Sequence, residues 1–188
     1  MIMSVITLFN YYQRPKRMIP LLNILNQIKT GKYRYLIERL RYSHEHDPGD
    51  EFNSLTRIIP KFSVSGNFII AKEKERIVSY SGNLLLEIPY LNRRDLESVK
   101  SQLKDDPYVM ACFVNALDCG LVIIIRSDGP KDKHRLYYKL ALNYYRNLTG
   151  VKEFSERGIR MNHCCMVSLD EDAFIGLGAI PFSDYLEN

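Results

Sequence analysis

Four short apolar runs beyond residue 80 predict β-strands, in which side chains point alternately to the two faces of a sheet. The runs cover 84–88, 109–115, 121–126 and 164–169. Apolar residues recur at helical spacing over 93–103 and 131–148, between the first and second runs and between the third and fourth. The loop between the second and third runs is short enough for a hairpin, in which we expect Gly120 to adopt a positive φ. The predicted order is therefore βαβ-βαβ.

This order predicts an α+β fold with a split βαβ-βαβ antiparallel sheet of the ferredoxin-like or RRM-like type. Strands 84–88 and 121–126 should lie side by side in the middle of the sheet, with both helices on one face. Because side chains alternate along a strand, Leu85 and Glu87 should lie on the other face, which we expect to be open. Arg126 should share that open face. We therefore expect Glu87 and Arg126 to be neighbours.

The first 78 residues predict a strand and three helices beside this core. Residues 4–9 alternate and predict a strand added to the edge of the sheet. Three segments have helical spacing, and Gly31 ends the first of them; they are 19–30, 32–42 and 51–57. A further alternating run at 62–66 predicts another strand. Since no linker or repeat divides the chain, we expect one domain over 1–188, with an N-terminal elaboration over 1–78 and the split core over 79–182.

Composition places the chain among ordinary globular proteins, with 188 residues, 46% hydrophobic and 26% charged. The net charge of +4 permits a nucleic-acid partner without requiring one. The four cysteines show no CxxC spacing, which favours buried thiols in a reducing compartment over a disulfide or zinc framework. We find neither a secretion-signal pattern nor an apolar run of about 18 residues. These features favour a cytoplasmic protein with no membrane association.

Two basic segments and one strand residue are candidate contacts to nucleic acid. The first segment combines tyrosines with cations in a predicted loop bracketed by Pro15 and Pro20, and the second opens the last helix. Such segments suit stacked bases and a phosphate backbone, but they are also typical of solvated surface. The candidates are Tyr11, Tyr12, Arg14, Lys16, Arg17, Arg126, Lys131, Lys133 and Arg135.

The run His44-Glu45-His46-Asp47 has metal-binding side chains at consecutive positions. Consecutive residues cannot all converge on one ion, and Pro48-Gly49 follows them. The run therefore predicts a loop rather than a metal site.

Several short motifs occur in an order that resembles the VirE N-terminal domain family, over about residues 4–182. They are Phe62-Ser63-Val64-Ser65-Gly66-Asn67-Phe68, Tyr80-Ser81-Gly82-Asn83-Leu84-Leu85-Leu86-Glu87, Asp106-Pro107-Tyr108-Val109 and the segment from Cys165 to Phe174. That family is found in Bacteroidetes, often in proteins linked to mobile elements and ahead of primase-like or helicase-like regions. It is related to the archaeo-eukaryotic primase-polymerase fold. The resemblance implies a palm-like sheet, in agreement with the order predicted from periodicity.

The resemblance also implies where a catalytic site would lie. Enzymes of the wider superfamily hold two Mg²⁺ ions with two acids spaced one residue apart on the first palm strand. Here the first position is Glu87 and the second is Pro89, and Val122 stands where a basic residue is expected after the hairpin glycine. The family's Asp-x-Ser-Arg corresponds to Arg160-Met161-Asn162-His163. Glu87 and His163 are thus the remnant of a catalytic site, with Glu87 the metal ligand if the domain is active.

We therefore expect a degenerate primase-polymerase-like domain without catalysis or cofactor, which binds single-stranded DNA or a replication protein during mobile-element DNA replication. One alternative is an active, Mg²⁺-dependent, primase-like nucleotidyl transferase. A replacement acid would then come from Asp118, Asp128, Asp170 or Asp172. Another alternative is a structural or regulatory protein-binding domain, dimeric through an exposed edge at 4–9. Metal and nucleotide binding separates the first two functions, and salt-dependent DNA affinity separates the first and third.

Overall fold

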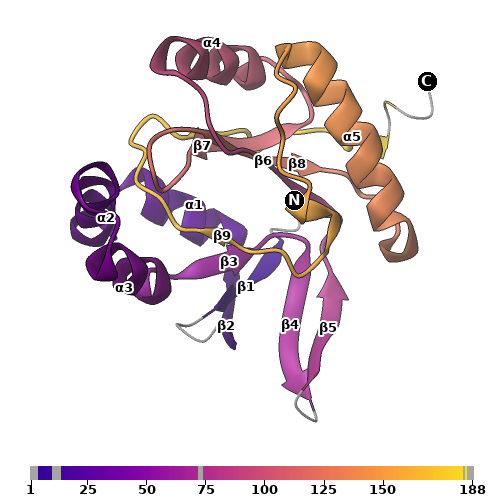
Figure 1. The fold of residues 1–188 in the computed structure, drawn as a ribbon. Coiled ribbons are helices and arrows are strands. Elements are labelled where there is room, and N and C mark those ends of the chain that lie inside the picture. Colours follow the sequence, from indigo (N-terminus) through magenta and orange to yellow (C-terminus); the bar gives the residue numbers. More distant parts are fainter. Residues whose placement is uncertain (1–3, 10–13, 72–73, 184, 186–188) are drawn as a thin grey trace.

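The computed structural model describes residues 4–9, 14–71, 74–183 and 185 of the chain. Within these residues the protein has a mixed α+β fold of five α-helices and three antiparallel sheets (Figure 1). No helix in these ranges has the length and apolar character needed to span a bilayer.

Four strands form the central sheet: β6 (Asn83–Ile88), β7 (Val109–Val114), β8 (Leu121–Arg126) and β10 (Phe174–Ile175). Their order is β10-β7-β8-β6. The predicted β7–β8 hairpin and the pairing of β6 with β8 are both confirmed. In this register Glu87 lies opposite Val122, and Asn83 lies opposite Arg126. Arg126 and Glu87 are therefore at opposite ends of the strand pair, and the expectation that they are neighbours is wrong.

Two helices cover one face of the central sheet, as predicted (Figure 1). They are α4 (Arg93–Lys104) and α5 (His134–Thr149), the latter preceded by the 3-10 turn η1 (Lys131–Lys133). Asn92 caps α4 by accepting a hydrogen bond from the backbone N–H of Asp95 at 3.0 Å. Leu84, Leu86 and Ile88 pack in the core beneath these helices. The period of two thus assigned the residues of β6 to the correct faces.

The N-terminal region builds a second layer on the other face of the sheet. It contains β1 (Val5–Phe9), β2 (Pro15–Pro20), α1 (Leu21–Lys29), α2 (Arg34–His46), α3 (Asp50–Ile58) and β3 (Lys61–Ser63). Together with β9 (Cys165–Met166), three of these strands form a sheet with the order β2-β1-β3-β9. Leu85 and Ile124 are buried in the core that this layer shares with the central sheet. The face that we expected to be open is therefore covered over most of its length.

The predicted four-stranded split sheet is incomplete. Strand β6 lies at an edge of the central sheet and not in its middle, because the run 164–169 contributes only β9, which joins the second sheet. The residues after β9 form single hydrogen bonds and do not continue a strand. The N–H of Val167 donates to Pro60 O, and the side chain of Asp170 accepts from the N–H of Val114. An apolar run specifies a buried, extended segment but not its pairing partner.

Local predictions in the N-terminal region also need correction. Strand β1 lies between β2 and β3, so residues 4–9 offer no exposed edge for a dimer. The segment from Pro15 to Pro20 is an edge strand and not a loop, which suits proline because an edge strand can lack ladder donors. Helix α2 continues through His44 to His46, where we expected a loop. Gly31 does end the first helix, with φ +72°.

Gly120 is required for a different reason from the one predicted. The positive φ in the β7–β8 loop belongs to Asp118, at 61°, and Gly120 is not among the residues with positive φ. A Cβ at Gly120 would lie only 2.1 Å from Ile88 O. Glycine is therefore needed there because two backbones approach closely.

The hairpin of β4 (Gly66–Ala71) and β5 (Lys74–Tyr80) forms the third sheet and extends away from the body of the molecule (Figure 1). The sequence analysis predicted a strand at 62–66, just before this hairpin, but did not predict the hairpin itself. Its base leads directly into β6.

Candidate functional site

Glu87 and His163 meet at the edge of the central sheet. His163 Nε2 donates a hydrogen bond to Glu87 Oε2 at 2.8 Å. The side chain of His163 is 11% exposed and that of Glu87 is 23% exposed, so the pair is partly accessible to solvent. A carboxylate oxygen can only accept here, so Nε2 carries the proton in this contact. The two residues that the resemblance assigned to one remnant site are thus in contact in the structure.

The segment after α5 closes the free edge of β6 and positions His163. The N–H of Ser155 donates to Glu87 O at 2.8 Å, the single bridge that this segment makes to β6. Next comes the 3-10 turn η2 (Arg157–Ile159), in which a Cβ at Gly158 would lie 2.1 Å from Leu85 O. Ser63 Oγ then donates to Met161 O at 3.1 Å and ties the segment to the second sheet. His163 is therefore held between the two sheets.

Helix α5 holds the same segment through two side-chain hydrogen bonds. Tyr138 Oη donates to Ser155 O at 2.6 Å, and His134 Nε2 donates to Gly158 O at 3.2 Å. Because Nε2 is the donor, His134 Nδ1 accepts the hydrogen bond from Tyr80 Oη at 2.9 Å. Burial lowers the pKa of His134 below its usual value, because the charged ring would lose its hydration. A neutral His134 thus links the hairpin, α5 and the site segment.

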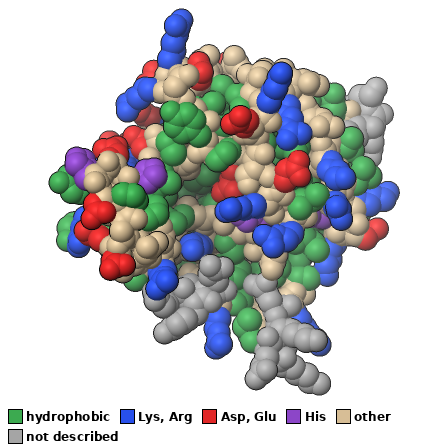
Figure 2. Space-filling view, viewed as in Figure 1, with side chains coloured by type: hydrophobic (Ala, Val, Ile, Leu, Met, Phe, Trp, Pro, Cys, Tyr) green, Lys and Arg blue, Asp and Glu red, His purple; other side chains and the backbone are tan. Residues whose placement is uncertain are grey.

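A cleft of about 790 Å³ opens beside Glu87 and His163. In Figure 2 this face is hollowed near its middle, and Lys and Arg side chains gather beside the hollow, over the segment that joins α5 to β9. The cationic residues that line the cleft are Lys61, Arg157 and Arg160. Asn115, Ser155 and Asn162 add polar groups.

Positive charge dominates this cleft. Arg157 and Arg160 are exposed and Lys61 is half-buried, and no described acid lies within ion-pair distance of any of the three. Glu87 is the only acid among the described residues that line the cleft, and it is occupied by His163. Three cations without acidic partners favour the binding of an anion such as phosphate.

The cleft does not fit a Mg²⁺ site. Within the described ranges, no group of three or more His, Cys, Asp and Glu side chains is placed to hold a metal ion. The proposed replacement acids are engaged elsewhere: Asp170 binds Lys100 at 2.6 Å, Asp128 binds Arg126 at 2.5 Å, and Asp118 lies 3.8 Å from Arg41. Asp118 and Asp172 line a different pocket, beside α4. One carboxylate is a poor ligand set for this ion.

The other sequence candidates do not join this site. Arg14, Lys16 and Arg17 are exposed at the start of β2, and Tyr11 and Tyr12 lie outside the described residues. Lys131, Lys133 and Arg135 are exposed at η1 and the first turn of α5, where His134 is buried. Arg126 lies at the far end of β8 from the cleft, paired with Asp128. These residues remain separate candidates for phosphate contacts.

Lys61, Arg157 and Arg160 were not among the candidates from the sequence. Arg160 precedes His163 by three residues, so its position in the motif Arg160-Met161-Asn162-His163 was a usable signal. No sequence motif marked Lys61 or Arg157 as a candidate. Lys61 lies on β3 and Arg157 on η2, and only the tertiary structure brings these two segments to the same cleft.

The comparisons with known proteins support one family. The sequence model of the BT4734-like, N-terminal domain family matches residues 54–174, which is more than half of the chain and contains Glu87, His163 and the cationic residues of the cleft. Neither curated proteins nor solved structures yield a match. The chain therefore belongs to the BT4734-like, N-terminal domain family.

Proposed function

We propose that this domain binds single-stranded nucleic acid through the cleft beside Glu87 and His163, without catalysing nucleotidyl transfer. The observation that carries the proposal is the set of Lys61, Arg157 and Arg160, three cations around one cleft with no acidic partner among the described residues. Phosphate contacts supply most of the affinity of such proteins and do not depend on base sequence.

The ligand set supports the part of the proposal that excludes catalysis. Phosphoryl transfer through two metal ions needs acids that hold both ions in line with the attacking and leaving oxygens. Glu87 is a single carboxylate, and its Oε2 already accepts the hydrogen bond from His163. The pair fits a role in shaping the cleft and offering His163 Nδ1 to a bound group.

The proposal keeps the wider assignment made from the sequence, a degenerate primase-polymerase-like domain in mobile-element DNA replication. Its support is the VirE-like motif order together with three strands in the order β7-β8-β6 beneath two helices. A protein partner in replication is the alternative if nucleic acid does not bind.

The experiment compares three triple variants that each remove three positive charges. The cleft variant changes Lys61, Arg157 and Arg160 to Ala; the matched controls change Arg14, Lys16 and Arg17, or Lys131, Lys133 and Arg135. Fluorescence anisotropy with a labelled single strand is measured at several salt concentrations. We expect only the cleft variant to abolish most binding and to reduce the slope of log K against log salt by about 2.

Two results would contradict the proposal. One is undetectable binding at low salt, which would favour the protein-partner alternative. The other is binding that the cleft variant retains and a control variant loses, which would move the interface to β2 or to the start of α5. Separately, primer extension with Mg²⁺ or Mn²⁺ that disappears in Glu87→Gln would show an active nucleotidyl transferase.

A further inference from the structure

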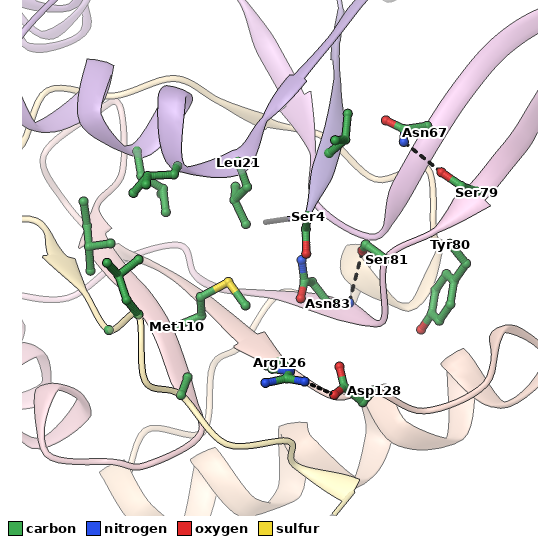
Figure 3. Close-up of a pocket in the computed structure, with 17 residues that line it drawn as sticks. Ser4, Leu21, Asn67, Ser79, Tyr80, Ser81, Asn83, Met110, Arg126 and Asp128 are labelled. Carbon is green, nitrogen blue, oxygen red and sulfur yellow. Dashed lines mark hydrogen bonds and ion pairs between the residues drawn. The ribbon is translucent and has the colours of Figure 1, made fainter. Parts of the chain in front are cut away.

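A second cavity, of about 570 Å³, lies at the opposite end of β6 from Glu87. It is lined by α1, the base of the β4–β5 hairpin, the ends of β6 and β8, and the chain after β10 (Figure 3). A volume of this size is typical of small-molecule pockets. None of its described lining residues belongs to the cleft beside Glu87.

Large parts of the cavity wall are apolar. Helix α1 contributes Leu21 and Leu25, and strands β7 and β10 contribute Met110 and Ile175. Leu177, in the chain after β10, also lines the cavity and is 52% exposed. The apolar part of a ligand would cover this surface and remove it from water, which favours binding.

Arg126 and Asp128 are the only charged side chains among the described residues that line this cavity. They pair at 2.5 Å between Arg126 Nη2 and Asp128 Oδ2, and Figure 3 shows the pair on the side of the cavity away from Leu21. The side chain of Arg126 is 43% exposed and that of Asp128 is 36% exposed, so a ligand can reach both.

The pair can bind a ligand at little cost. A guanidinium has five N–H donors and a carboxylate accepts several hydrogen bonds, so each group can serve a ligand as well as its partner. An exposed ion pair contributes little to stability, so small movements that admit a ligand are inexpensive.

Backbone hydrogen bonds fix the position of this pair in the fold. The N–H of Phe182 donates to Arg126 O at 2.7 Å, and the N–H of Ser127 donates to Gly82 O at 2.9 Å. The end of β8 is thus tied to the chain after β10 and to the turn before β6. A ligand therefore meets a site whose backbone is already ordered, which lowers the entropic cost of binding.

Two neighbouring charges of opposite sign select the kind of ligand. A ligand with a single charge is attracted by one member of the pair and repelled by the other. A zwitterion with adjacent charges matches both, because its carboxylate accepts from Arg126 and its ammonium donates to Asp128. A free α-amino acid carries both groups on one carbon atom, whereas a peptide carries them at its two ends.

We propose that this cavity binds a free α-amino acid with a large apolar side chain. The charged end of the amino acid lies on Arg126 and Asp128, and its side chain lies against the apolar wall formed by α1, β7 and β10. A small amino acid would leave this wall uncovered. The site does not depend on the nucleic-acid function proposed above.

Isothermal titration calorimetry of the wild-type protein with L-phenylalanine, L-tryptophan and L-leucine tests the proposal. We expect saturable binding of at least one of them and none of free glycine, which has the charged end without the apolar body. Two derivatives of the strongest ligand then remove one charge each: the N-acetyl derivative lacks the ammonium, and the amide lacks the carboxylate. Each derivative should bind about tenfold more weakly, the effect of one lost charge-assisted hydrogen bond.

Two variants assign these charges to residues. Asp128→Asn should abolish the preference for the amino acid over its N-acetyl derivative, and Arg126→Gln should abolish the preference over its amide. Asparagine suits the φ of 53° at Asp128. Arg93→Gln, which opens the exposed pair with Glu97 on α4, is the matched control and should bind like the wild type.

The proposal is overturned if none of the three amino acids binds saturably, if free glycine binds as well as they do, or if either derivative binds as tightly as its parent. It is also overturned if each preference survives the variant meant to abolish it. Should a variant fail to fold, the derivatives measured on the wild-type protein still decide.

Discussion

The side chains of Glu87 and His163 meet at 2.8 Å although the residues are 76 positions apart in the sequence. Glu87 lies on the edge strand β6, and His163 arrives on the segment that closes that edge. The contact joins the two sheets at the cleft.

Glu87→Gln should tighten single-strand binding about twofold. The change removes the only acid among the described residues that line the cleft. The repulsion between one carboxylate and a nearby phosphate in water is worth roughly 0.5 kcal/mol. Glutamine retains an oxygen that accepts from His163. Anisotropy at low salt measures the effect, and Glu97→Gln on the exposed face of α4 is the matched control. Weaker binding in Glu87→Gln would show that the carboxylate contacts the ligand.

Stability should decrease as pH falls below about 6.5, in part through His134. Burial lowers the pKa of His134 from its ordinary value of 6.5, so the unfolded chain takes up a proton that the folded chain does not. The contribution to the free energy of unfolding is complete above pH 6.5 and is lost as pH falls toward the lowered pKa. Urea unfolding between pH 7 and 5 should show a flatter profile for His134→Gln. An unchanged profile would contradict this assignment.

Lys100→Met should destabilise the protein by about 3–5 kcal/mol. Lys100 and Asp170 are each only 8% exposed and pair at 2.6 Å, so the change leaves an uncompensated buried carboxylate. Urea unfolding provides the measurement. Arg93→Met, in an exposed pair with Glu97, is the matched control and should leave the midpoint nearly unchanged. Similar effects of the two changes would show that the buried pair has no special role.

Gly158→Ala should cost about 1–3 kcal/mol and weaken single-strand binding. The added Cβ would lie 2.1 Å from Leu85 O, so η2 must move away from β6 and take Arg157 with it. Gly178→Ala is the control, because a Cβ there meets nothing within 4 Å. The explanation fails if Gly158→Ala retains full stability.

Two of the four cysteines should react rapidly with a thiol reagent in the folded protein. Burial raises the pKa of Cys112 to about 12 and raises that of Cys165 well above its usual value, whereas Cys119 and Cys164 are partly exposed. Cys164 lines the cleft and Cys119 does not. A bound single strand should therefore slow the labelling of Cys164 alone, as mass spectrometry of the labelled peptides would show. Equal protection of both thiols would argue against binding in the cleft.

Local patterns in the sequence were sufficient for the elements around β6. The period of two placed Leu84 and Leu86 under the helices and Leu85 and Glu87 on the other face, and helical spacing gave α4 within one residue. These features are local because backbone geometry alone determines which side chains share a face. The resemblance added Glu87 and His163 as candidates, and the structure brings them into contact.

Only the tertiary structure decided which strands pair and what lines the cleft. The run at 164–169 was expected to form a strand of the central sheet, yet only β9 forms there, and it pairs with β3. Strand β6 is therefore left at an edge, where Ser155 bonds to Glu87. The β6–β8 register places Arg126 opposite Asn83, at the far end of the strand pair from Glu87. Lys61 and Arg157 reach one cleft from separate segments. Pairing, register and loop path depend on contacts between distant segments, whose energies no local pattern of apolar and polar residues contains.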